Sequence, residues 1–161
     1  MDVSPIVNEM VSIADFIGEL YEENTVLLQN VPENPQSGTF LIQFQNDNRE
    51  RISALAISGN REYRVIYFGD QAPDVLKKMD GLSRLFLYGR RVIPIKDEEN
   101  EEGSLRYIRV MDFSFGEIFK TVQNEDVEAC IGVLQTQTKE ARDVETYEKI
   151  MEVYTRFKNN D

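Results

Sequence analysis

The sequence predicts a single α+β domain over residues 1–161, in which a largely antiparallel β-sheet is packed by an N-terminal helix, a central helix and a C-terminal helix. Apolar residues alternate in some segments and recur every three or four residues in others, patterns typical of strands and of helices. No linker-like stretch or internal repeat divides the chain. With 161 residues, of which 41% are hydrophobic, the chain is long enough for one core and short for two.

The first segment predicts an amphipathic helix that ends near Glu23. Ser4 can cap it, and Pro5 stands in its first turn, where a missing backbone N–H does no harm. The apolar stripe has the spacing of one buried helix face and consists of Ile6, Met10, Ile13, Ile17 and Leu20. We therefore expect this face to pack on the sheet.

Four predicted strands follow, and an antiparallel meander is the simplest arrangement for them. Residues 25–30 and 39–45 predict two strands joined by an irregular hairpin loop that contains prolines and a glycine. Residues 52–57 and 63–68 predict the next two strands. They flank Gly59-Asn60, a dipeptide typical of a tight turn.

The apolar period then changes to that of a second helix. Pro73 marks its start and Gly89 its end, whereas Gly81 weakens its middle, so we expect this helix to be short or kinked. Its buried stripe would consist of Val75, Met79, Leu82 and Phe86.

The last third predicts a long hairpin and a closing helix. Residues 91–95 and 105–115 are strand-like runs around an acidic loop, 97–103, and residues 129–138 predict a further strand beside them. From Asp143 the apolar residues have helical spacing, which predicts a C-terminal helix before a polar tail, 159–161. Aromatic residues on or beside these strands would fill the core, namely Phe68, Tyr107, Phe113, Phe115 and Phe119.

The residue inventory disfavours most catalytic chemistry. The chain has no histidine, so it can form neither a Ser-His-Asp nor a Cys-His pair, nor a histidine zinc helix. Its one cysteine, Cys130, lies in a predicted strand and is expected to be a buried, inert thiol. No glycine-rich phosphate loop is present. We expect a protein that is not an enzyme and that has no cofactor and no metal. Carboxylates at strand ends are the remaining catalytic alternative, with Asp70, Asp74 and Asp112 as candidates.

The charge is strongly acidic, with 29 carboxylates against 18 lysines and arginines and a net charge of -11. Tight binding to nucleic acid or to an anionic membrane requires the opposite sign. No signal peptide or membrane span is apparent, so a cytoplasmic protein is expected. The acidic run of residues 97–103 predicts a solvated loop tip, and it lacks the residue order of a calcium-binding loop. A basic cluster around the second helix either faces a carboxylate-rich patch of a neighbour or serves solubility and local pairing; it consists of Lys77, Lys78, Arg84, Arg90 and Arg91.

Three stretches, taken in order, resemble the tail terminator (tail completion) proteins of long-tailed bacteriophages. The first is YRVIYFG at 63–69 followed by DVLKKM at 74–79, a strand that leads into a helix. The second combines RVIPI at 91–95 with YIRV at 107–110 and FSF at 113–115. The third runs from GVL at 132–134 through EAR at 140–142 to YEKIM at 147–151.

The resemblance implies a structural protein that caps the tail tube as a ring, commonly of six copies, stops tube polymerisation and offers a surface for head–tail joining. It implies a place in the virion at the head–tail interface, assembly in the host cytoplasm, and three kinds of partner: itself, the tail tube protein and a head completion or connector protein. DNA would pass through the lumen without tight binding, and no membrane is involved. The loops at 30–38 and 95–104 are the candidate interfaces. Together with the arginines before the second loop, they supply the candidate residues Val31, Glu33, Gln36, Asp97, Glu98, Glu99, Glu101, Glu102, Arg90 and Arg91.

An acidic DNA mimic that inhibits a nucleic-acid-binding protein is the alternative function. Such a mimic needs carboxylates along one exposed helix face. The predicted helices instead carry mixed signs, with basic residues at Lys77, Lys78, Arg84, Lys149, Arg156 and Lys158.

Overall fold

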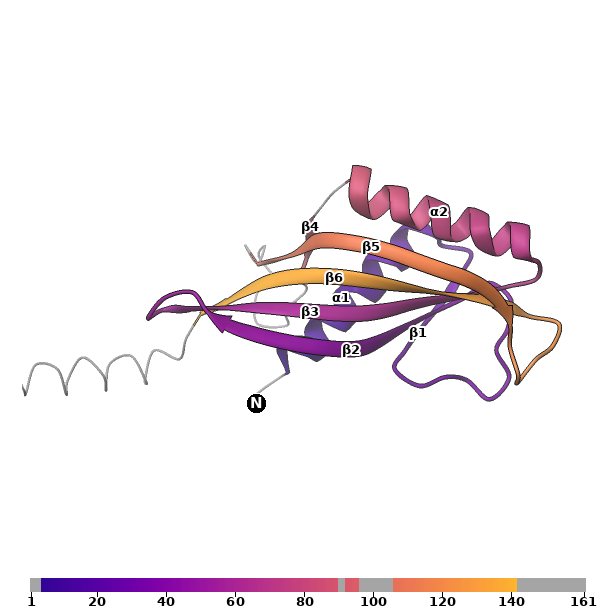
Figure 1. Cartoon of the computed structure of the whole chain (residues 1–161), viewed down its shortest axis with the longest axis horizontal. Coiled ribbons are helices and arrows are strands. Elements are labelled where there is room, and N and C mark those ends of the chain that lie inside the picture. The colour runs from indigo at the N-terminus through magenta and orange to yellow at the C-terminus, as the bar shows by residue number, and fades with distance from the viewer. Residues whose placement is uncertain (1–3, 90–91, 96–105, 142–161) are drawn as a thin grey trace, which may run out of the picture.

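The computed structural model describes residues 4–89, 92–95 and 106–141, which form an α+β fold of two helices and one curled, mixed six-stranded sheet (Figure 1). The elements in chain order are α1 (Pro5–Leu20), β1 (Thr25–Leu28), β2 (Thr39–Arg51), β3 (Ala56–Gly69), α2 (Ala72–Tyr88), β4 (Val92–Pro94), β5 (Tyr107–Lys120) and β6 (Glu128–Ala141). The strand order in the sheet is β1-β2-β3-β6-β5-β4. The third helix, expected from Asp143, and the polar tail lie outside the described residues.

Helix α1 begins at Pro5 as predicted, but it ends at Leu20, before the expected end near Glu23. Met10, Ile13 and Ile17 are buried, whereas Leu20 is 46% exposed, so its predicted place in the core is wrong. Tyr21 takes that place because its ring packs against Phe40, with the ring centroids 5.5 Å apart. The Ser4 side chain makes no capping hydrogen bond; its carbonyl oxygen accepts one from the Asn8 N–H.

Strand β1 pairs with β2 in parallel, so the predicted hairpin between them is wrong. Parallel neighbours need a connection that returns to the starting end of the first strand, and the loop of residues 29–38 makes it. The loop starts at Gln29, which has a left-handed backbone (φ 65°), and closes at Gly38 (φ 83°). Gly38 N–H donates to the Phe68 carbonyl and the Gly38 carbonyl accepts from Thr25 N–H, which joins the loop end to two strands.

Strands β2 and β3 form one long antiparallel hairpin in which Gly59-Asn60 lies within β3, so the predicted turn at this dipeptide is wrong. The turn lies at residues 52–55, where the N–H groups of Ile52 and Ser53 both donate to the Ala56 carbonyl. The predicted strands at 52–57 and 63–68 therefore become a turn and a single strand of 14 residues.

Helix α2 runs unbroken for 17 residues, contrary to the expected short or kinked helix. Its predicted apolar stripe is buried, and Gly89 is its C-cap, as predicted. Gly81 has a packing role that explains its presence in the helix. A Cβ at this position would lie 3.2 Å from the Tyr21 hydroxyl oxygen, so the glycine lets α2 approach the end of α1.

The predicted hairpin around the acidic loop is present, because β4 and β5 are antiparallel and Ile93 pairs with Ile108. The predicted strand after it is β6, which lies between β3 and β5 in the middle of the sheet. Phe68 and Phe113 are buried as expected and Phe115 is partly buried, whereas Tyr107 and Phe119 are almost half exposed. The last two therefore do not fill the core.

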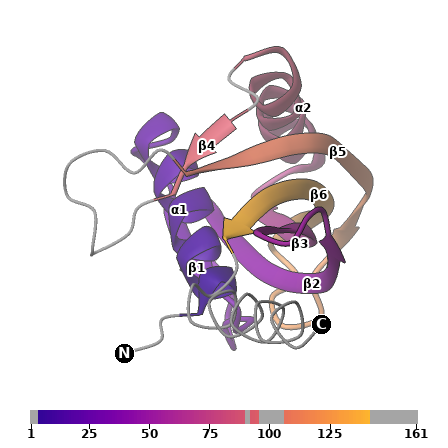
Figure 2. The same ribbon diagram turned by 90° about the vertical axis from the view of Figure 1, so that its left-hand side faces the viewer.

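Both helices contribute to one main core on the same face of the sheet. The Phe16 and Phe86 rings stack at 5.9 Å and join the two helices, and Phe86 also meets Phe113 of β5 at 5.2 Å. Helix α1 contacts both β1 and β4, the two edge strands, so it bridges the open side of the curled sheet (Figure 2). A second, smaller apolar cluster is formed by Leu41, Ile66, Phe68, Val127 and Ala129.

Candidate functional site

Three of the predicted interface residues lie in the β1–β2 loop. Val31, Glu33 and Gln36 are exposed there, as an interface role requires. The loop is anchored rather than loose, since Pro35 is buried and its carbonyl accepts a hydrogen bond of 3.1 Å from the side-chain amide of Asn124, in the β5–β6 turn.

The other predicted interface residues lie outside the described residues, namely Arg90, Arg91, Asp97, Glu98, Glu99, Glu101 and Glu102. The structure describes the base of their hairpin, where the Ile95 N–H donates to the Arg106 carbonyl at 3.1 Å. Among the described members of the basic cluster, Lys78 and Arg84 make intramolecular contacts. Lys78 Nζ lies 3.2 Å from a carboxylate oxygen of Glu23 and 4.5 Å from the centre of the Tyr21 ring, and Arg84 pairs with Asp80 at 3.2 Å. These contacts fit the local-pairing interpretation.

A buried ion cluster, which the sequence did not reveal, lies on the face of the sheet that α1 covers. Arg61 of β3 is completely buried and contacts three carboxylates: Glu9 of α1 at 2.5 Å, Asp47 of β2 at 3.0 Å, and Glu140 of β6. Its guanidinium also donates to the Thr138 hydroxyl at 3.0 Å. One side chain thus ties α1 to three strands, and we call this group the Arg61 cluster.

The Arg61 cluster holds more carboxylates than cations. Arg49 adds a second positive charge, 3.6 Å from Asp47 and 3.7 Å from Glu140, but it is partly exposed. Burial raises the pKa of Glu9, although the Arg61 guanidinium beside it acts in the opposite direction. Burial also raises the pKa of the Tyr63 hydroxyl, and the negative charge of Glu9 adds to that effect. A Glu9 that holds its proton to a higher pH reduces the excess negative charge of the cluster.

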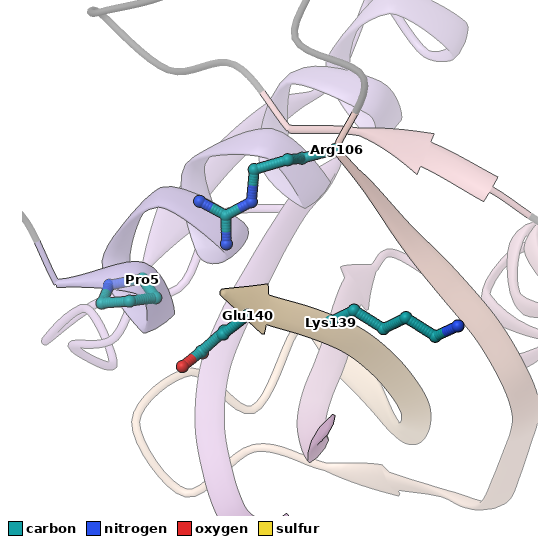
Figure 3. A pocket seen from close by; sticks show the side chains of 4 residues that line it. All are labelled: Pro5, Arg106, Lys139 and Glu140. Carbon is teal, nitrogen blue, oxygen red and sulfur yellow. The ribbon is translucent and has the colours of Figure 1, made fainter. Parts of the chain in front are cut away.

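A pocket of about 360 Å³ borders this cluster at the end of β6. Pro5 of α1, Arg106, Lys139 and Glu140 line it, with Lys139 and Glu140 pointing away from each other as neighbours on a strand do (Figure 3). Its carboxylate, Glu140, is already bound to Arg61. Arg106 and Lys139 are the cationic residues of its lining.

The described residues contain no group of three or more acidic or cysteine side chains placed to hold a metal ion. The carboxylates of Glu9, Asp47 and Glu140 converge, but the Arg61 guanidinium occupies the space between them. Cys130 is buried, as predicted, and burial raises the pKa of its thiol.

The alternative catalytic carboxylates are not assembled into one site. Asp70 follows the end of β3 and Asp74 lies in the first turn of α2. Asp112 of β5 pairs with Gln135 of β6, and Gln135 pairs on its other side with Glu62 of β3. Eight residues of extended strand separate Glu62 from Asp70, or roughly 25 Å.

The sequence contains one signal of the Arg61 cluster. Glu9 precedes Met10 and shares its helix face with Ile13, so an acid stands within the buried stripe. A buried carboxylate needs a partner, yet helical spacing does not reveal which strand supplies it.

No protein-family model matches this chain, and none of the curated proteins compared with it has a matching sequence. Neither described helix is long and apolar enough to cross a membrane.

Proposed function

We propose that this chain is a structural tail terminator, which caps the tail tube of a long-tailed bacteriophage as a ring, stops tube polymerisation and forms the surface for head–tail joining. The observation that carries the proposal is a pair of unlike projecting surfaces on one sheet. The β2–β3 hairpin extends from one end of the molecule, and the anchored loop of residues 29–38 lies toward the other (Figure 1). A subunit that contacts neighbours through two different surfaces forms heterologous, head-to-tail assemblies such as rings.

The positions of the stretches that resemble tail terminators support the proposal. The first stretch falls on β3 and the start of α2, a strand that leads into a helix. The second falls on the β4–β5 hairpin, where residues 92–94 of its first run pair with residues 107–109 of its second run. The third begins on β6.

The partners follow from the proposed role. They are further copies of this chain, six in a ring if the resemblance holds, the tail tube protein, and a head completion or connector protein. The ring would assemble in the host cytoplasm and remain in the virion at the head–tail interface. Its net charge of -11 suits a channel through which DNA passes without being held, because like charges repel.

Growing tail tubes provide the direct test. Tubes polymerising from the tube protein of the same phage should stop growing when this chain is added in proportion to the number of tube ends, and the protein should be found at the ends by electron microscopy. A phage that lacks the gene should make tubes of uncontrolled length that do not join heads. Normal tail length and normal head joining in that phage would refute the proposal. A strict monomer that inhibits a DNA-binding enzyme would instead favour the DNA mimic.

A further inference from the structure

The turn of the β2–β3 hairpin holds two large apolar side chains out in solvent. Ile52 is 52% exposed and Leu55 is 55% exposed. The backbone beneath them is ordered by hydrogen bonds from the N–H groups of Ile52 and Ser53 to the Ala56 carbonyl, at 3.1 and 3.2 Å. We call residues 51–55 the hairpin tip. An ordered turn that presents apolar side chains at the end of a long hairpin is suited to insertion into a partner.

One side of the hairpin is basic near its tip. Side chains alternate along a strand, so Arg49 and Arg51 share one face of β2 and Glu50 lies on the other. Arg49 is engaged by Asp47 and Glu140, whereas Arg51 lies further out and is exposed. The tip therefore combines an apolar end with a positive flank.

A groove of about 510 Å³ runs between the C-terminal half of α1 and β1. Ala14 and Gly18 of α1 and Val26 of β1 give it an apolar floor. The floor is open because these side chains are small; a Cβ at Gly18 would already lie 4.0 Å from a methyl group of Val26. The rim carries the exposed carboxylate of Glu22; Asp15 and Glu19 also line the groove, but each already has an interaction of its own within the chain. We call this the α1 groove.

The end of α1 adds to the negative potential of the groove. The C-terminus of a helix has a partial negative charge, which cations stabilise and anions destabilise. The last turn of α1 contains no basic residue, and Glu19 lies within it. An arginine supplied from outside would therefore be stabilised both by Glu22 and by the helix dipole.

The tip and the α1 groove of one molecule are too far apart to meet. Helix α1 starts beside Glu140 and is tied to Arg61 through Glu9, and from there it runs away from the tip (Figure 1). In the opposite direction, six residues of strand separate Arg61 from Leu55, or roughly 20 Å. Only a second molecule can bring the two surfaces together.

We propose that the hairpin tip of one copy docks into the α1 groove of a second copy, with Ile52 and Leu55 against Ala14, Gly18 and Val26, and Arg51 beside Glu22. The inference deepens the proposed function and rests on its ring, because a tip-to-groove contact is heterologous and repeats from copy to copy. It keeps the hairpin as one surface of the ring contact, places the other surface in the α1 groove, and leaves the loop of residues 29–38 for contact with the tube.

Two single variants and their mixture test the interface. Leu55→Asp disables the tip and leaves the groove intact, whereas Gly18→Arg blocks the groove and leaves the tip intact. Each variant should weaken self-association, with a dissociation constant at least about tenfold higher than that of the parent. Sedimentation velocity and native mass spectrometry measure it. Mixed together they retain one tip and one groove, so they should form a discrete 1:1 dimer. Leu76→Asp is the matched control, because Leu76 is 51% exposed on α2.

Thermal unfolding of every variant confirms that it folds, and Leu55→Ser replaces Leu55→Asp if the latter does not. As a second readout, a Leu55→Cys copy should form a disulfide with a Gly18→Cys copy. A parent oligomer that persists in both variants would overturn this interface and leave the proposed ring standing. A parent that stays monomeric at every concentration, alone and with tube ends, and shows no such cross-link would overturn both.

Discussion

The guanidinium of Arg61 lies in the space that a side chain at position 59 would need. A Cβ on Gly59 would be 2.9 Å from Arg61 Cζ and equally close to its Nη1. Arg61 is long, but its head group cannot move aside freely because Glu9, Asp47 and Glu140 hold it from three elements. Gly59 is thus part of the Arg61 cluster, and its role is to make room rather than to turn the chain.

Gly59→Ala should therefore destabilise the fold. The added methyl group forces the guanidinium away from its carboxylates, and overpacking of this kind costs about 1–3 kcal/mol. Urea unfolding at neutral pH measures the change. Gly116→Ala is the control, since a Cβ at Gly116 of β5 meets nothing within 4 Å. Equal stability of the two variants would show that Arg61 has another place to go.

A second prediction concerns the pH dependence that Glu9 contributes. Burial raises the pKa of Glu9 above its usual value of 4.5, so the folded chain keeps this proton to a higher pH than the unfolded chain does. The stability that the protonated group contributes is then complete below the unfolded-state pKa and is lost as the pH rises through the folded-state pKa. Glu9→Gln cannot titrate and escapes this loss.

The free energy of unfolding of Glu9→Gln, relative to that of the parent, should therefore increase from pH 4 toward neutrality. Urea titrations at several pH values measure it, and the other titrating groups largely cancel in the difference. Thr138→Val is a useful companion with the opposite sign. The Thr138 hydroxyl bonds both Arg61 and Glu9, and its bond to Glu9 lowers the pKa of that carboxyl, so the stability of Thr138→Val relative to the parent should fall as the pH rises. A relative stability of Glu9→Gln that falls as the pH rises would mean that attraction to Arg61 outweighs burial.

The core face of α1 gives a third prediction with a neighbouring control. Ile17 is completely buried, so Ile17→Asp places an unpaired carboxylate in the core at a cost of several kcal/mol, comparable with the stability of the domain. Leu20→Asp should leave the thermal transition almost unchanged, because Leu20 is half-exposed. A cooperative transition near the parent value for Ile17→Asp would show that α1 does not dock on the sheet in solution.

Periodicity located the helices and most strands because it records which side chains are buried. The stripes of α1 and α2, the β4–β5 hairpin and β6 were all predicted from it. Pairing partners depend on contacts distant in sequence, and there the predictions were wrong. Thr25–Leu28 resembles half of a hairpin, but the left-handed Gln29 and the clamp at Gly38 return the chain for parallel pairing.

The Arg61 cluster could not be predicted for the same reason, because its side chains come from positions distant in the sequence. Gly59-Asn60 has the local signature of a turn, and only the burial of an arginine two positions after the glycine explains why it lies within a strand. The partners of Arg61 are 52 residues before it, 14 residues before it and 79 residues after it. No spacing rule for a single helix or strand connects residues so far apart.

The anchored loop of residues 29–38 supports a fourth prediction, which separates its structure from its proposed use. The Asn124 amide donates to the Pro35 carbonyl, and its oxygen accepts from the Asp126 N–H. Asn124→Asp removes the donor and keeps the acceptor, so the β5–β6 turn should persist while the loop loses its tie. Limited proteolysis should then cut the loop several times faster, with the free energy of unfolding lowered by about 1 kcal/mol.

If Val31, Glu33 and Gln36 contact the tube, this variant should also bind tube ends more weakly while its self-association through the hairpin tip is unchanged. Unaltered proteolysis would show that the Asn124 bond does not hold the loop, and a loosened loop with unaltered end binding would place the tube contact elsewhere.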